Sequence, residues 1–394
     1  MEEWKEYKLK DVAILTTGFP FDGHKYSKEG IRVVRGDNVT IGNLRWDSDK
    51  DKRWNEPFER SSEFSLFADD IVIGMDGSRV GKNRAQIKQE DLPLLIAQRV
   101  ACVRHNELSL QSFLYYQIFS DSFEQYIRAV HTGTSIPHVS LKQIGDFPIV
   151  LPPLSAQKQI ASILKTLDDK IEVNRKMNEN LEQQAQALFK SWFVDFEPFK
   201  NGEFVESELG MIPKGWRVYS LSEFLPVITG KKDANVAKGG PYPFFSCSQD
   251  YGWTDDYSFE GNAILVAGNG DFNVKMYNGK FEAYQRTYVL IPHNPQYTAW
   301  LFYAVKYHLN DITSAARGSV IKFITKGNLA DFRFPAPSNL DKTEVIERFS
   351  CIKRIVASNQ QESRRLATLR DTLLPKLMSG EFFASKASQA PSEK

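Results

Sequence analysis

The chain carries one sequence pattern twice, and this duplication restricts its fold more than any other feature. Four residues near the start recur 212 residues later: Trp4, Tyr7, Leu9 and Gly18 recur as Trp216, Tyr219, Leu221 and Gly230. Further along, an offset of 185 residues relates Gly133, Phe147 and Pro152 to Gly318, Phe332 and Pro337. Between these segments, Gln98-Arg99 has a counterpart in Gln285-Arg286. The repeat predicts one structural unit formed twice, with an internal deletion in the second copy.

Each copy ends in a long segment whose hydrophobic residues are spaced alternately four and three residues apart. This spacing is typical of a coiled-coil seam, where one stripe of a helix faces a partner helix. The first segment has room for a helix of about 35 residues, or roughly 50 Å. The predicted seam consists of Ile160, Leu164, Leu167, Ile171, Asn174, Leu181 and Leu188 in the first copy, and Val345, Phe349, Ile352, Val356, Asn359, Leu366 and Leu373 in the second. Arg370 is the one seam position that fits poorly.

Asn174 and Asn359 occupy the same step of the two seams. A polar residue buried in an apolar seam costs stability but fixes the register and orientation of the helices. The alternative is that each asparagine faces solvent where the helices separate. We favour the role in register because both copies carry the residue at the same step. The two helices are expected to pack antiparallel and to leave polar outer faces for other proteins.

The segments outside the helices predict globular domains of mixed α and β structure. The expected strands are Ile31–Val34, Asp70–Gly74, Arg99–Val103, Ala263–Ala267 and Thr287–Ile291, and the expected helices are Ser109–Phe119 and Gln296–Tyr307. The predicted class is α+β, with two such domains separated by an antiparallel, coiled-coil-like helix pair in a pseudo-two-fold internal repeat. The predicted boundaries are 1–152 (first domain), 153–196 (central helix), 197–213 (linker), 214–337 (second domain), 338–382 (C-terminal helix) and 383–394 (disordered tail).

Composition excludes several classes of protein. A hydrophobic content of 42% with 27 Phe suffices for sizeable cores. The longest apolar runs fall far short of the ~20 residues needed to span a bilayer, and the first residues lack the apolar segment of a secretory signal. Cys102, Cys247 and Cys351 match no zinc spacing. A cytoplasmic location without a membrane partner is therefore expected.

No catalytic motif is recognisable. The run from Asn294 to Tyr297 lacks the second proline of a methyltransferase loop, and no glycine-rich cofactor loop leads from a strand into a helix. Asp69, Asp70 and Asp76 cluster without the acidic-x-Lys pair of a nuclease core, and the six His show no ligand spacing. We therefore expect no catalytic residue, metal or cofactor in this chain.

Polar loops containing glycine carry Arg, Lys, Asn, Ser and Thr in both copies. Arg and Lys can bind guanine edges or phosphates, Asn can read adenine, and glycine permits close approach of the backbone. Such turns are common on any surface, so a single loop is weak evidence, whereas recurrence in both copies favours DNA. The predicted DNA-binding residues are Thr17, Arg35, Asn38, Ser78, Arg79, Lys82, Arg84, Thr132 and Thr134 in the first copy, and Lys231, Lys232, Ser246, Asn269, Arg317, Ser319 and Lys322 in the second.

Two segments carry a resemblance to a known family. LPPLSAQKQIASILKTLDDKIEVNRKMNENLEQQAQALFKSWFVDF at 151–196 and LRDTLLPKLMSGEF at 369–382 are similar to the DNA-specificity (S) subunit of type I restriction–modification systems. The resemblance covers essentially the whole chain, because proline-terminated domain, long helix and repeat follow in the family's order. It implies two target-recognition domains, each of which reads one half of a bipartite double-stranded DNA sequence.

The resemblance also implies partners. The helices would set the spacing of the half-sites and dock two modification (methyltransferase) subunits and, through them, restriction (nuclease/translocase) subunits. Catalysis would belong to those partners, with S-adenosylmethionine bound by the methyltransferase subunits and no cofactor in this chain. The recognition loops vary across the family, so the resemblance identifies no base-contacting residue.

The net charge of +1, from 50 Lys+Arg and 49 Asp+Glu, lacks the basic excess usual in DNA-binding domains. Phosphates respond to local patches, so a neutral chain can still bind DNA, but weak binding by the isolated chain is expected. Two alternatives are a scaffold that binds only proteins through its helices, and a nuclease or methyltransferase that acts alone.

Overall fold

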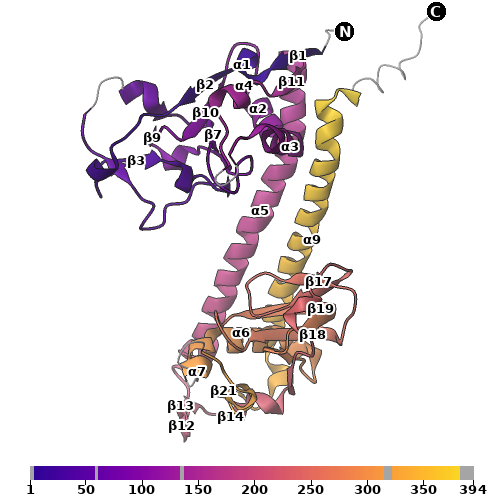
Figure 1. Cartoon of the computed structure of the whole chain (residues 1–394). Coiled ribbons are helices and arrows are strands. Elements are labelled where there is room, and N and C mark those ends of the chain that lie inside the picture. The colour runs from indigo at the N-terminus through magenta and orange to yellow at the C-terminus, as the bar shows by residue number, and fades with distance from the viewer. Residues whose placement is uncertain (1–3, 58–60, 134–136, 315–321, 382–394) are drawn as a thin grey trace, which may run out of the picture. The chain divides into compact units, whose positions relative to one another are not determined.

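The computed structural model describes residues 4–57, 61–133, 137–314 and 322–381. The predicted tail at 383–394 lies outside these residues. The chain forms two compact units, Met1–Ile171 with Arg364–Lys394, and Glu172–Ser363. The boundaries fall inside the two long helices, α5 (Leu154–Phe193) and α9 (Glu344–Met378), so each unit combines one globular domain with one end of both helices (Figure 1).

The first unit contains three sheets. The five-stranded sheet has the order β2 (Ala13–Thr17), β10 (Val100–His105), β7 (Ile71–Gly74), β8 (Arg84–Gln86) and β4 (Ile41–Gly42). The four-stranded sheet has the order β5 (Arg53–Trp54), β3 (Ile31–Val34), β9 (Leu94–Ile96) and β6 (Ser65–Leu66). A two-stranded sheet joins β1 (Lys5–Lys8) to β11 (Pro148–Leu151), and the helices are α1 (Leu9–Val12), α2 (Gln111–Ile118), α3 (Asp121–Val130) and α4 (Leu141–Gly145).

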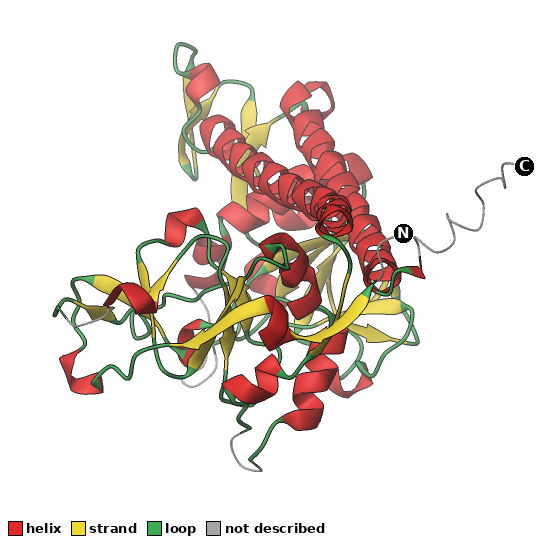
Figure 2. Cartoon of the chain, turned by 90° about the horizontal axis from the view of Figure 1, so that it is seen from above, coloured by secondary structure: helices red, strands yellow, loops and turns green. Residues whose placement is uncertain are grey.

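The second unit repeats this plan with fewer strands. Its six-stranded sheet has the order β15 (Val227–Thr229), β20 (Thr287–Leu290), β18 (Phe259–Ala267), β19 (Val274–Ala283), β16 (Tyr242–Phe245) and β17 (Gly252–Thr254). A two-stranded sheet joins β14 (Trp216–Ser220) to β21 (Arg333–Pro337), and the helices are α6 (Thr298–Tyr307), α7 (Leu309–Ser314) and α8 (Lys326–Ala330). In each domain most strands come in one run along the chain and three helices follow them, and Figure 2 shows helices and strands in both, which confirms the predicted α+β class.

The predicted linker at 197–213 differs from expectation. It contains a hairpin of β12 (Phe204–Ser207) and β13 (Gly210–Pro213), closed by a turn in which Gly210 has φ +94°. Glycine adopts this backbone without steric cost, so a segment that looks like a connector forms a paired structure.

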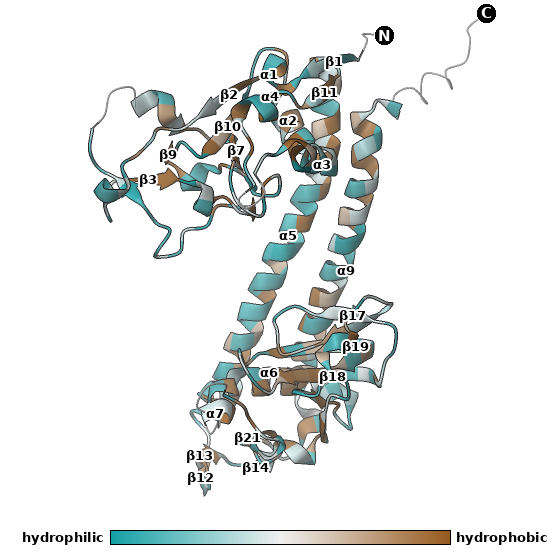
Figure 3. Ribbon diagram, viewed as in Figure 1, coloured by the Kyte–Doolittle hydropathy of each residue, from teal (hydrophilic) through white to brown (hydrophobic). Residues whose placement is uncertain are grey.

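The duplication is reproduced in strand register. Tyr7 lies opposite Ile149 in the β1–β11 pair, and Tyr219 lies opposite Phe334 in the β14–β21 pair, at the offsets found in the sequence. The central strands β7 and β20 are buried along their length, and β10 and β18 are buried over most of theirs. Strands β10 and β18 are coloured as hydrophobic in Figure 3. Because side chains alternate between the faces of a strand, equal register places equivalent residues on equivalent faces.

The long helices pack antiparallel within each unit. None of the predicted seam side chains is exposed. Asn174 is 1% exposed, and its amide donates hydrogen bonds to Glu362 (2.8 Å) and Ser363 (3.3 Å) of α9. Asn359 is half-buried and donates to Asn178 of α5 at 2.9 Å. Both asparagines therefore make polar contacts across the pair, which supports the role in register over the solvent-facing alternative.

In the first unit, a carboxylate of α5 joins both helices to the globular domain. Arg370 of α9, the poorly fitting seam position, donates to Asp168 at 2.7 Å, and the Tyr116 hydroxyl of α2 donates to the same carboxylate at 2.8 Å. Burial and the hydrogen bond to Asp168 raise the pKa of Tyr116, so its hydroxyl stays protonated as a donor. Arg370 is thus accommodated in the seam by pairing.

The second unit has an equivalent contact with different residues. Tyr303 of α6 donates to Glu182 of α5 at 3.1 Å, and Lys353 of α9 pairs with the same carboxylate. The Lys353 ammonium also lies 4.0 Å from the centre of the Phe302 ring. Burial opposes the charge of Glu182, but Lys353, Lys306 and Tyr303 outweigh burial and leave the pKa of Glu182 below its usual value.

We expect Glu182→Gln to lower the free energy of unfolding by about 2–3 kcal/mol, because it leaves the Lys353 charge buried without a counter-ion. The value lies below that for a fully buried pair because Glu182 is 25% exposed. The matched control is Glu179→Gln on the same helix, whose exposed pair with Arg175 should contribute about 0.5 kcal/mol or less. Urea denaturation measures both, and equal losses would contradict the role of the Tyr303–Glu182–Lys353 contact.

Candidate nucleic-acid interface

In the first unit, the turns that follow β2, β3, β7 and β9 lie at one edge of the sheets. Strands β3 and β9 are parallel, so their carboxyl ends share an edge. Strand β10 is antiparallel to β2 and β7, so its start lies beside their ends. The edge therefore gathers loops from distant parts of the chain, and we call it the loop edge.

A cavity of about 700 Å³ opens among these loops. Four arginines and two carboxylates line it: Arg35, Arg45, Arg79 and Arg99 against Asp37 and Asp76. Arg79 also lines an adjoining hollow of about 620 Å³ with Lys82 and Arg128. The loop edge is thus locally basic in a chain of almost zero net charge, which suits a polyanion.

Arg35 and Asp76 illustrate how the cavity is organised. The Arg35 guanidinium lies 5.6 Å from the centre of the Tyr26 ring, and its buried Nε has no hydrogen-bond partner among the described residues. The Asp76 carboxylate bonds His138 and lies 3.6 Å from Arg99. At the cavity wall, the Arg35 Nε is therefore a buried donor without a partner in the described part of the chain, whereas the Arg99 side chain is 63% exposed and shares its charge with a carboxylate.

Two predicted contacts in the first domain are wrong, the first being Asn38. This residue is fully buried; its oxygen accepts from the Arg35 backbone N–H at 3.0 Å, and its amide donates to the carbonyls of Arg45 and Lys50. A side chain committed to three backbone groups cannot reach DNA. Asn38 instead fixes the loop that presents Arg35.

The second wrong prediction is Arg84. It lies on β8 with 6% exposure and donates to the carbonyls of Ile118 (2.5 Å) and Ser120 (3.3 Å). Burial lowers the pKa of Arg84, although the charge of Glu124, 3.7 Å away, acts to raise it. Arg84 ties the sheet to the turn between α2 and α3 and is not available to a ligand.

The other predicted residues of this domain lie at the surface or near it. Ser78, Arg79 and Thr132 are exposed, and Thr17 is half-buried at the end of β2. Lys82 is half-buried, 3.5 Å from Glu124. Thr134 lies outside the described residues.

The second unit has a loop edge of the same construction. Strands β16 and β19 are parallel, and β20 is antiparallel to both β15 and β18. The loops after β15, β16 and β18 carry four predicted residues: Lys231, Lys232, Ser246 and Asn269. Lys231 is exposed, and the other three are half-buried. Exposed Lys322 joins them, because its carbonyl accepts from Gly270 at 3.3 Å. Arg317 and Ser319 lie outside the described residues.

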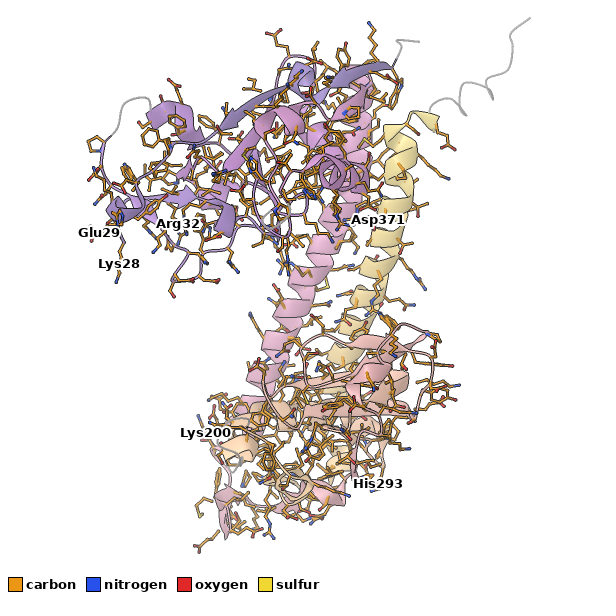
Figure 4. The ribbon with its side chains drawn as sticks, in the orientation of Figure 1. Lys28, Glu29, Arg32, Lys200, His293 and Asp371 are labelled. Atoms are coloured by element: carbon orange, nitrogen blue, oxygen red, sulfur yellow. The ribbon has the colours of Figure 1, made fainter. Side chains whose placement is uncertain are left out.

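Sequence reasoning missed Arg45 and the two Gln-Arg pairs at the loop edges. Arg45 lies three residues after Gly42, in a loop that was not among the predicted DNA-binding loops. Gln98-Arg99 and Gln285-Arg286 served only as markers of the duplication, although their recurrence was itself a signal. Arg32, which is half-buried and labelled in Figure 4, has a structural role: it makes two hydrogen bonds to Asp51 and lies over the Trp46 ring.

The described residues contain neither a metal-binding cluster nor a membrane-spanning helix. Among them, no group of three or more His, Cys, Asp and Glu side chains is arranged to hold a metal ion. In the same part of the chain, no helix combines the length and apolar character needed to cross a membrane.

The buried and exposed arginines of the first domain allow a stability test. We expect Arg84→Ala to lower the free energy of unfolding by about 2–4 kcal/mol, because it empties a buried site and removes the donors of two carbonyls. Arg79→Ala, five positions away and exposed, should change it by less than about 0.5 kcal/mol. Urea denaturation distinguishes them; a stable Arg84→Ala protein would show that Arg84 is not structural.

Comparisons with known proteins agree with the duplication. A family model described as a type I restriction modification DNA specificity domain matches residues 1–183 and 213–367, one match in each copy. The EcoDI specificity subunit of Escherichia coli is 36% identical over 185 residues, which is 46% of this chain and 41% of that protein. The HindI specificity subunit of Haemophilus influenzae is 23% identical over 97% of this chain and its own full length. This chain thus spans about two fifths of the first relative's length.

A solved structure shares the fold. The S subunit of a type I restriction–modification system from M. genitalium superposes with a TM-score of 0.58 and 18% identity over 96% of each chain. At this level of identity the likeness concerns the fold alone.

Proposed function

We propose that this chain, which belongs to the type I restriction–modification DNA specificity family, reads a bipartite DNA sequence, one half with each globular domain. The observation that carries the proposal is the loop edge that recurs in both units. Each gathers polar and basic side chains from several loops on a rigid sheet, the arrangement that positions base-reading groups.

The two loop edges carry different residues at equivalent positions, which supports recognition of a different DNA half-site by each domain. Val34 and Phe245 end the two equivalent parallel strands, so Arg35 of the first domain corresponds to Ser246 of the second. Asp76 forms a bridge with His138, and Asn269 forms the equivalent bridge with Phe323 in the second domain. Charge and hydrogen-bonding capacity thus change at equivalent positions, and these properties distinguish base pairs in the major groove.

We propose that the partner subunits dock on the long helices α5 and α9. Apolar side chains remain exposed along them, namely Ile163, Val173 and Met177 on α5, and Ile355 and Leu369 on α9. Such side chains on otherwise polar helices support docking of other proteins. We propose two modification (methyltransferase) subunits there and, through them, restriction (nuclease/translocase) subunits. S-adenosylmethionine would be bound by the methyltransferase subunits, and this chain would supply specificity without catalysis.

The helices also supply a spacer. The 40 residues of α5 correspond to about 60 Å, and half-sites on one face of DNA repeat at about 34–36 Å. We propose that helix length sets the number of unread base pairs between the half-sites.

The proposal is tested by mapping methylated adenines in the genome of cells that carry or lack this gene. We expect a split sequence motif that disappears with the gene. Replacing residues 1–152 by the corresponding domain of another family member should change one half of the motif and leave the other half and the spacing intact, because the reading loops of the two domains are independent.

The reciprocal exchange of residues 214–337 is the control and should change the other half. A motif altered in both halves by one exchange would contradict independent reading. A motif unaffected by either exchange would favour a scaffold that binds proteins alone.

A further inference from the structure

The Gln-Arg pair forms the tip of the same tight turn in both domains. In the first, the Val100 N–H donates to the Ala97 carbonyl at 3.0 Å, and in the second the Thr287 N–H donates to Tyr284 at 2.7 Å. Each turn therefore presents glutamine and arginine at its two central positions. All four of these side chains belong to exposed residues.

Neighbouring segments hold both turns by corresponding backbone hydrogen bonds, one of which is shifted by one residue in the second domain. In the first domain, Phe19 donates to Ile96 (3.0 Å), Gln98 donates to Phe19 (3.1 Å) and Met75 donates to Arg99 (3.1 Å). The counterparts in the second domain are Lys231 to Ala283 (3.0 Å), Gln285 to Lys232 (2.9 Å) and Gly268 to Arg286 (2.8 Å). The tips are thus fixed in space at the loop edge, between the loops after β2 or β15 and after β7 or β18.

A glycine makes each approach possible. A Cβ on Gly18 would lie 2.0 Å from the Ile96 carbonyl oxygen, and a Cβ on Gly230 would lie 2.1 Å from that of Tyr284. No other residue fits without moving the turn. The glycines explain the backbone, but they impose no side chain on the exposed tip.

The fold therefore does not account for the identity of the tips. The residue before the pair changes from Ala97 to Tyr284, and the facing loop changes from Asp76 to Asn269. Exposed positions free of packing tolerate substitution, so the retention of both glutamine and arginine indicates a ligand shared by the two domains.

We infer that the two Gln-Arg turns bind the sugar–phosphate backbone of DNA, one turn at each half-site. This inference rests on the proposed function. Bases differ between the half-sites, whereas phosphates are the same everywhere. The same two side chains on turns of the same type therefore suit phosphate contacts that set the position of each domain. Arginine offers five donors in a fork that matches phosphate oxygens, and the glutamine amide adds a neutral donor.

The arginines differ in one respect. Asp76 lies 3.6 Å from Arg99, whereas the equivalent Asn269 is neutral, and no carboxylate lies within 4 Å of Arg286 among the described residues. Arg286 therefore presents its full charge, and Arg99 shares its charge with Asp76. The contribution of Arg286 to DNA binding should equal or exceed that of Arg99.

The test uses the full chain assembled with its modification subunits. Affinity is measured across a series of salt concentrations for a duplex carrying the mapped motif and for one of unrelated sequence. For Arg286→Ala we expect affinity for both duplexes to fall by the same factor, and the slope of log affinity against log salt to become shallower by about 1. Arg99→Ala should change the slope by about 1 or less, and the double variant by up to about 2.

Two controls separate charge from structure. Arg99→Lys and Arg286→Lys keep the charge and should preserve the salt slope. Arg217 of β14 has a 51% exposed side chain that pairs with Glu223, and it belongs to none of the loops of the loop edge. Arg217→Ala should therefore leave both affinities unchanged.

The outcomes distinguish the two proposals. An unchanged salt slope in Arg286→Ala, or a loss confined to the motif-bearing duplex, would overturn phosphate binding by the turns. If the wild-type complex showed no preference for the motif, the proposed function would fail, whereas a shallower slope in the variants would still support the phosphate contacts.

Discussion

The architecture of each unit depends on one carboxylate of α5 that accepts a tyrosine hydroxyl from the globular domain and pairs with a cation of α9. Asp168 plays this part in the first unit and Glu182 in the second. These charges are partly buried, and such a charge favours close contact with its partner because that contact offsets the desolvation penalty. Sliding or rotating either helix would break the contact, so it fixes the domain on the helices. The tyrosines, Tyr116 and Tyr303, come from the equivalent helices α2 and α6, whereas the ion pairs occupy different steps of the helices.

That difference shows what the duplication preserved. Backbone hydrogen bonds, strand register and glycines at close approaches recur in both domains, because they depend on main-chain geometry. Side chains at loop tips contribute little to packing, so they can diverge without cost to the fold. The loop edges combine both properties. A rigid backbone presents variable side chains such as Arg35 and Ser246. Separating the fold from the side chains in this way lets recognition change while the fold is kept.

Much of the fold was predictable because its signals are local. Strands such as Ile31–Val34 and Thr287–Leu290, the helix at α6, and the seam all follow from hydrophobic spacing. The site was less predictable. Arg84 and Asn38 are of residue types common in DNA-binding loops. However, Arg84 donates to the carbonyl of the last residue of α2, and Asn38 bonds three backbone groups of its own loop. Whether a polar side chain is taken up by internal hydrogen bonds depends on segments distant in the sequence. Residue spacing along the chain carries no information about those contacts.

The arrangement of charge makes the proposed DNA binding compatible with a net charge of +1. Acidic and basic residues pair with one another along the long helices, as Lys165 does with Asp169 and Arg175 with Glu172, so these surfaces contribute little net field. At the first loop edge the local net charge is positive, because four arginines and two carboxylates line the cavity. Beyond about 8 Å in physiological salt, the influence of exposed charges elsewhere on the chain is largely screened. Under the proposed function, affinity for DNA would be decided by the few cations at each loop edge. Partner subunits with basic surfaces of their own would add phosphate contacts without altering which bases are read.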